Sequence, residues 1–150
     1  MARACARPLT LTAVLALFAG AAAATETTHT VQMLNKGEAG AMVFEPAYIA
    51  AQPGDTIVFV PTDRGHNAAT LEGIAPEGAE PFKGDMGKEV SITVTAEGLY
   101  GIECTPHAGM GMVALIQVGA PTNLEAATAA AADLRGKAKE RLLEALALVN

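Results

Sequence analysis

Apolar and polar residues alternate over short distances between residues 28 and 118, which is the pattern of β-strands. Val90, Ile92 and Val94 are separated by serine and threonine, as in a strand that buries one face. Residues 57–60 are all apolar and predict a strand that is covered on both faces. Proline and glycine at positions 53–54 predict a turn. Short strands joined by such turns predict an antiparallel β-sandwich.

The pattern becomes helical after residue 119. Asn123 stands at a predicted helix start, and Glu125 places a negative charge in the first turn, where the helix dipole favours it. An alanine-rich run extends to Leu134, and Gly136 is positioned to end this helix. A second helix carries one apolar stripe, which we expect to pack on the sandwich and to have a structural role without chemistry: Ala138, Leu142, Ala145, Leu146 and Val149.

The first 24 residues have the features of an export signal. Arg3 and Arg7 precede a short apolar run at residues 9–17, and a run of alanines offers a cleavage site after Ala24. The apolar run is too short to span a membrane. We therefore expect export to the periplasm by a signal peptide at 1–24, with no membrane anchor after its removal.

The remaining residues, 25–150, are expected to form a single domain. Its sandwich would occupy about residues 28–119 and its helical extension about residues 122–149. Signal removal takes away Cys5, so that Cys104 is the remaining cysteine and must be protected by burial or by a ligand. It also leaves 8 basic against 16 acidic residues, which changes the formal net charge from −6 to −8. This acidity excludes a broad affinity for nucleic acid or anionic lipid.

Two segments carry the residues with chemistry, the triplet around His66 and the stretch from Cys104 to Met112. Strand alternation places Cys104 on the same face as Ile102, toward the core. Met112 begins a second strand that also faces inward, and His107 lies between the two strands in a loop with a proline and two glycines. His66 would arrive from a separate loop. Four ligands on two loops are therefore expected at one end of the sandwich.

Two imidazoles, one thiolate and one thioether are the ligand set of a copper site that exchanges single electrons. Zinc sites do not recruit thioether sulfur, so the set favours copper. We expect one type 1 copper ion held by His66, Cys104, His107 and Met112. Met110 competes with Met112 for the fourth position, and strand phase favours Met112. A site with no open coordination position predicts an electron carrier rather than an enzyme.

Two further residues are predicted to tune this site. The backbone N–H of Asn67 is expected to bond to the Cys104 thiolate and to lock the two loops together. Pro106 lacks an N–H group and would withhold a donor from the sulfur. His29, on the first strand, is interpreted as structural, and it is the one histidine left after the ligands are assigned.

The chain resembles the pseudoazurins, a group within the cupredoxin family, over nearly all of the expected mature sequence. The resemblance implies a Greek-key, mainly β cupredoxin sandwich with two C-terminal helices, a periplasmic carrier and the same four copper ligands. It also implies electron donation to a copper nitrite reductase or another terminal reductase. Glu103 and Ala108 depart from the family pattern, which has a lysine and an aromatic residue there. The matching segments are Asn35-Lys36-Gly37, residues 42–48, Pro53-Gly54-Asp55-Thr56, Gly65-His66-Asn67, residues 76–80 and Cys104-Thr105-Pro106-His107.

The expected docking face is a small apolar rim around His107, formed by Met42, Ala108 and Met110. A monomeric carrier with a weak, transient interface suits redox partners such as copper nitrite reductase or a c-type cytochrome. Two alternatives remain open from the residues, a copper storage or delivery protein and a carrier for a different dehydrogenase and oxidase pair. Exposed methionines favour the first alternative, and Met110 is its support.

Overall fold

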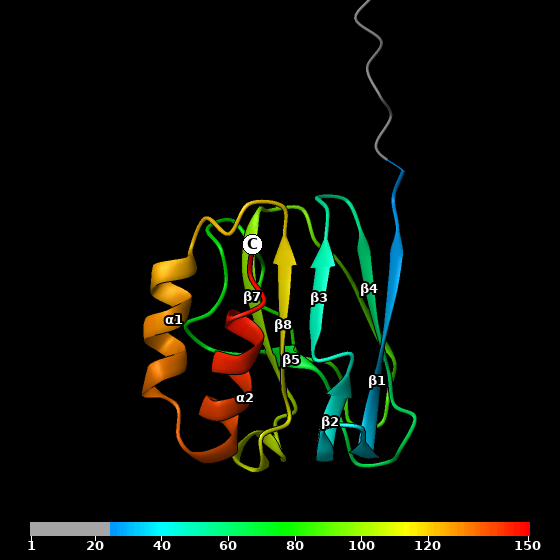
Figure 1. Cartoon of the computed structure of the whole chain (residues 1–150). Helices are drawn as coiled ribbons and strands as arrows, with labels where there is room; N and C mark the ends of the chain where they lie inside the picture. Colours follow the sequence, from blue (N-terminus) through cyan, green and yellow to red (C-terminus); the bar gives the residue numbers. More distant parts are fainter. Residues whose placement is uncertain (1–24) are drawn as a thin grey trace, which may run out of the picture.

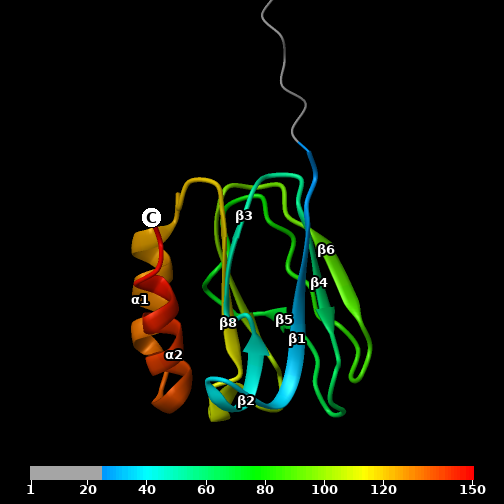
Figure 2. The same cartoon turned by 45° about the vertical axis from the view of Figure 1, so that its right-hand side comes forward.

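The computed structural model describes residues 25–150 as two facing β-sheets with two helices against one of them (Figures 1 and 2). The predicted signal peptide and Cys5 lie outside the described residues. No helix among the described residues is long and apolar enough to cross a membrane. The elements are β1 (Thr28–Gly37), β2 (Gly40–Glu45), β3 (Tyr48–Ala51), β4 (Thr56–Val60), β5 (Ala69–Thr70), β6 (Val90–Thr93), β7 (Gly98–Glu103), the 3₁₀ helix η1 (Ala108–Met110), β8 (Val113–Val118), α1 (Leu124–Asp133) and α2 (Gly136–Leu146).

The predicted fold class, a mainly β sandwich with two C-terminal helices, is confirmed, but the sheets are mixed rather than antiparallel. One sheet has the order β2-β1-β4-β6 and the other β3-β8-β7-β5. The pairs β1–β4 and β3–β8 are parallel. The reason is that β2 and β3 follow one another in the chain but lie in different sheets. The strands that then become neighbours come from distant parts of the sequence, and their direction is not set by a hairpin.

The two sheets differ in how much of each strand is covered. Ile57 and Phe59 of β4 are fully buried, whereas Val58 and Val60 are only half-buried. The prediction that residues 57–60 are covered on both faces is therefore wrong, because no helix among the described residues 25–150 covers the outer face of that sheet (Figure 2). In contrast, β7 is buried on both faces. Ile102 packs between the sheets, and Leu99 packs beneath the helices.

The two helices lie on the outer face of the sheet that contains β7 and β8 (Figure 1). The predicted stripe on α2 packs there, with Leu142 fully buried against Leu115 of β8 in one apolar cluster. The prediction that Gly136 ends α1 is wrong. Gly136 is the first residue of α2 and has a positive φ of 57°. The amide of Asn123 does not cap α1 either, because it bonds to the backbone N–H and C=O of Leu99.

Candidate metal centre

Three of the predicted ligands meet at one end of the sandwich. Nδ1 of His66 lies 3.1 Å from Nδ1 of His107, and the sulfur of Cys104 lies 3.7 Å and 3.5 Å from these two nitrogens. Together they form the cluster of possible metal ligands among the histidine, cysteine and acidic residues that the structure describes. His66 and Cys104 are fully buried, and His107 is partly exposed.

The ends of β7 and β8 place Cys104 and Met112 side by side. The backbone N–H of Cys104 donates to the carbonyl of Met112 at 3.0 Å, which continues the antiparallel pairing of the two strands. Inside the loop, the N–H groups of Met110 and Met112 both donate to the carbonyl of His107. The loop is thus a tight hydrogen-bonded turn that starts and ends in the sandwich core.

His66 is oriented by a residue that sequence reasoning did not select for the site. Its Nε2 lies 2.9 Å from the side-chain oxygen of Asn35, at the far end of β1. Because an amide oxygen can only accept, Nε2 must carry the proton, and the lone pair of Nδ1 then points toward Cys104 and His107. The N–H of Asn35 donates in turn to Asp63 at 2.7 Å. The position of Asn35 in a motif shared with the pseudoazurins was the available signal for its role.

Asn67 joins the two loops through its side chain as well as its backbone. Its Oδ1 accepts from the N–H of Thr105 at 2.9 Å, and its Nδ2 donates to the hydroxyl of Thr105 and to the carbonyl of Gly84. Its backbone N–H also acts to lower the pKa of Cys104. The side chain of Asn67 is thus an amide bridge between the two loops, which strand phase could not reveal, and its tuning of the thiolate stays a prediction. Pro106 is exposed beside this bridge.

The electrostatics of the cluster favour neutral donors before a metal binds. Burial lowers the pKa of His66, and the neighbouring His107 lowers it further. Burial raises the pKa of Cys104, while backbone hydrogen bonds from Asn67 and His107 act in the opposite direction. The raised pKa of Cys104 favours the thiol, whose proton is released on metal binding, and the lowered pKa of His66 favours the neutral imidazole that binds a metal.

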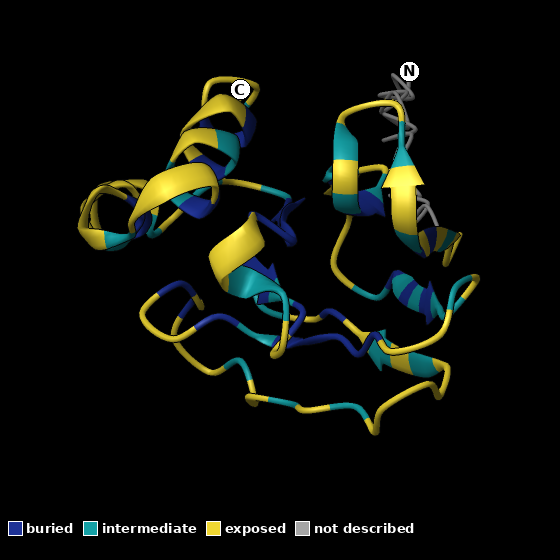
Figure 3. Ribbon diagram, turned by 90° about the horizontal axis from the view of Figure 1, so that it is seen from below, coloured by how far each residue is buried: buried dark blue, intermediate teal, exposed yellow. Residues whose placement is uncertain are grey.

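The methionines separate as strand phase predicts. Met112 is fully buried in the core between the sheets with Cys104, whereas Met110 is 48% exposed on η1. Ala108 and Met42 are half-buried. Seen end-on from below, η1 lies in the middle of this end of the molecule, with partly and fully exposed residues facing outward (Figure 3).

Glu103, the residue before Cys104, is half-buried. Burial raises its pKa, and the charge of Lys83 offsets only part of this rise.

The donor set and its spacing fit a single copper ion. Ring nitrogens and thiolate sulfur bind transition metals at about 2.0–2.3 Å, so donor atoms 3.1–3.7 Å apart can share one ion. A thiolate beside two imidazoles, with thioether sulfur nearby, suits copper in both of its common oxidation states.

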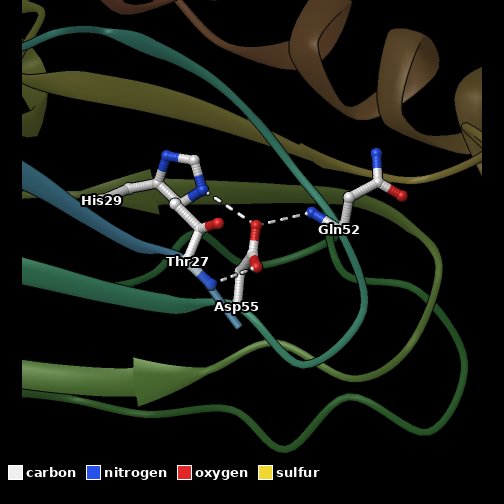
Figure 4. Close-up of polar contacts among 4 residues, drawn as sticks. All are labelled: Thr27, His29, Gln52 and Asp55. Atoms are coloured by element: carbon white, nitrogen blue, oxygen red, sulfur yellow. Dashed lines mark hydrogen bonds and ion pairs between the residues drawn. The ribbon is translucent and has the colours of Figure 1, made fainter. Parts of the chain in front are cut away.

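His29 is not part of this cluster. Its Nε2 donates to Oδ2 of Asp55 at 2.9 Å, and the same carboxylate accepts from the N–H groups of Thr27 and Gln52 (Figure 4). These bonds, with that from Gln52 first, lower the pKa of Asp55 to about 2. His29 thus joins the first strand to the turn before β4.

Comparisons with known proteins agree with this chemistry. Residues 31–119 match the model of a family described as copper binding proteins of the plastocyanin/azurin family. A pseudoazurin from Paracoccus pantotrophus is 55% identical over 139 residues, which are 92% of this chain and 94% of that protein. The native pseudoazurin structure from Hyphomicrobium denitrificans has a TM-score of 0.74 and 45% identity, and covers 82% of this chain and 98% of its own. The pseudoazurin of Methylobacterium extorquens AM1 also has a TM-score of 0.74, at 43% identity, and covers 80% of this chain and 97% of its own.

Proposed function

The chain belongs to the plastocyanin/azurin family of copper-binding proteins, and within it to the pseudoazurins, and from this premise we propose its ligands, location and partners. It has the cupredoxin fold, its cofactor is copper, and it is an electron-transfer protein and not an enzyme. We propose that it is a periplasmic carrier that donates electrons to a terminal reductase such as a copper nitrite reductase.

The proposed ligands are His66, Cys104, His107 and Met112. The observation that carries this assignment is the triangle of two Nδ1 atoms and one Sγ atom, each within 3.7 Å of the others. Met112 is added because it is buried in the same core, next to the backbone bond that joins it to Cys104. When bound, the copper ion supplies the Cu(II)/Cu(I) couple for one-electron exchange.

The protein's own contribution is to hold these side chains still. Asn35 fixes the ring of His66, and Asn67 ties the His66 loop to the loop that carries Cys104 and His107. A ligand set that does not move when its charge changes favours rapid electron exchange, because little reorganisation is required. Pro106 is proposed to assist by leaving the region near the sulfur without an extra N–H donor.

Electrons are proposed to enter and leave through His107. It is the partly exposed member of the cluster, and the proposed docking rim consists of Met42, Ala108 and Met110. A small apolar contact suits a monomeric carrier that must leave its partner after each transfer. Because the chain is acidic overall, any charge guidance must come from exposed basic residues: Lys36, Arg64, Lys83 and Lys88.

Stopped-flow mixing with candidate acceptors tests the proposed function. The reduced, copper-loaded protein should pass one electron to a copper nitrite reductase, and the rate should vary with ionic strength if charges guide docking. A c-type cytochrome serves as the second acceptor. Failure to reduce either acceptor would reject the proposed partners.

N-terminal sequencing of the exported protein tests the proposed signal peptide. The sequence should begin at Thr25, and an uncleaved N-terminus would reject the signal peptide.

A further inference from the structure

One arginine of the C-terminal helix contacts both sides of the metal-binding end. Arg141 lies in the middle of α2 and is half-buried. Its Nη1 donates to the carbonyls of Gly111 at 2.7 Å and Met42 at 2.8 Å. Its Nη2 donates to the carbonyls of Ala41 at 3.1 Å and Ala39 at 3.2 Å. These two nitrogens carry four of the five N–H donors of the guanidinium, and four backbone carbonyls accept from them.

These acceptors come from two segments that the sheets do not join directly. Gly111 immediately precedes Met112, a proposed ligand, whereas Ala39, Ala41 and Met42 belong to the turn between β1 and β2 and to the start of β2. Within residues 25–150, Arg141 forms no ion pair. Its charge is therefore compensated by carbonyl dipoles, and the side chain connects α2, the ligand loop and β2.

The peptide units that Arg141 holds are backbone positions that need support. Met42 has a φ of 51°, and among residues 25–150 it is the residue other than glycine with a positive φ. Such a conformation is strained for a residue with a side chain and persists where the surroundings fix it. Gly111 has a φ of 91°, and a Cβ at this position would lie 2.7 Å from Cβ of Lys137 and 3.2 Å from Cδ of Arg141. The helix thus touches the ligand loop at the residue before Met112.

We propose that Arg141 is a positioning residue for the metal centre, which fixes the backbone of Gly111 and Met42 and thereby the placement of Met112 and of the docking rim. This proposal rests on the ligand set proposed above. It assigns α2 a part in the chemistry, whereas the apolar stripe of this helix predicts a structural role alone. A lysine at this position would keep the charge and the stem, but its single nitrogen cannot reach four carbonyls in two segments.

Arg141→Lys is the central test, with two controls on the same helix. Lys139→Ala removes another cation, whose Nζ donates to the carbonyl of Ala132 on α1, away from the ligand loop. Leu142→Ala removes a fully buried side chain of the apolar cluster beneath the helices and should lower the melting temperature. Arg141→Ala provides a stronger variant, and Arg141→Lys remains informative if that protein does not fold.

Two measurements read the backbone and the ligands separately. In the metal-free protein, Arg141→Lys should speed hydrogen exchange about tenfold at the Val113 amide, whose N–H donates to the carbonyl of Gly111. In the copper-loaded protein, it should change the intensity ratio of the thiolate-to-copper absorption bands. Lys139→Ala should change neither, and Leu142→Ala should lower the melting temperature while leaving the band ratio as in the wild type.

Unchanged exchange and an unchanged band ratio in Arg141→Lys would overturn the proposal. It would also be overturned if Leu142→Ala changed the band ratio as much as Arg141→Lys, because general loosening of the helix would then explain the effect. A wild-type protein without a thiolate-to-copper band would reject the proposed ligands instead. In that case the exchange measurement on the metal-free protein would still decide whether Arg141 holds the loop.

Discussion

One histidine lies near each end of strand β1, and the two imidazoles have different surroundings. Near its start, His29 is partly exposed and donates to the carboxylate of Asp55. Near its end, Asn35 accepts from His66, which is fully buried and faces a thiol and a second imidazole. Six residues of extended strand, about 20 Å, separate the two positions. Both histidines donate through Nε2, so the difference lies at the other nitrogen: Nδ1 of His66 faces the sulfur of Cys104 and Nδ1 of His107, whereas His29 lies outside the cluster of possible metal ligands among the described residues.

The largest effect that separates the two ends is expected from Cys104→Ser. It should remove the thiolate-to-copper absorption completely, because a hydroxyl cannot supply the thiolate that produces the band. Asp55→Asn, at the other end of the sandwich, should leave the visible spectrum of the copper-loaded protein unchanged. A spectrum altered by Asp55→Asn would show that the two ends are coupled.

Asn35→Ala should have the next largest effect. The loss of its side-chain oxygen frees the ring of His66, and loss of such a partner typically lowers metal affinity by about 10–100-fold. Competition between the protein and a copper chelator measures this change. Asn35→Asp retains an acceptor and should lose much less affinity. Equal losses in both variants would argue against the role assigned to the hydrogen bond.

At the Asp55 end of the sandwich, the contribution to the free energy of unfolding should depend on pH. Asp55 has a pKa of about 2 in the folded protein, below the value of about 3.9 for an unfolded chain. Its contribution to the free energy of unfolding is therefore complete above about pH 4 and is lost as the pH falls toward 2. Thermal melts of the metal-free protein should show a gap between the wild type and Asp55→Asn that narrows over this range. A gap that stays constant would contradict the assignment.

The smallest effect is expected from Met110→Ala. This side chain is on the surface, so the free energy of unfolding should change by no more than about 0.5 kcal/mol. The visible spectrum should remain that of the wild type, because the proposed ligand is Met112. The rate of electron transfer to the acceptor should fall if Met110 belongs to the docking rim. A changed spectrum would contradict the choice between the two methionines.

The pattern of apolar residues within one strand or helix was sufficient to predict which face of that element is buried. Alternation along β7 and β8 predicts that Cys104 and Met112 face the same core and that Met110 does not, and the structure agrees. The apolar stripe on α2 likewise predicts the face that packs on the sheet. Two-residue and helical periodicities express which side of one element is buried, and this information lies within that element.

The remaining features depend on contacts between distant segments. The parallel pairing of β1 with β4, the bond from His66 to Asn35 and the four bonds of Arg141 join residues 28 or more positions apart. Asn123 shows the same effect, because the structure uses its amide to hold Leu99 rather than to cap the helix that it precedes. A single sequence shows that such side chains can form hydrogen bonds, but it does not show which residue each one bonds to.

Titration of the metal-free protein with Cu(II), followed by visible absorption, tests the central claim most directly. The claim is that His66, Cys104, His107 and Met112 hold one copper ion at the end of the sandwich away from Asp55. It predicts an intense thiolate-to-copper band that saturates at one copper per chain and is absent in Cys104→Ser. A colourless complex, saturation at another stoichiometry, or a band that survives in Cys104→Ser would contradict it.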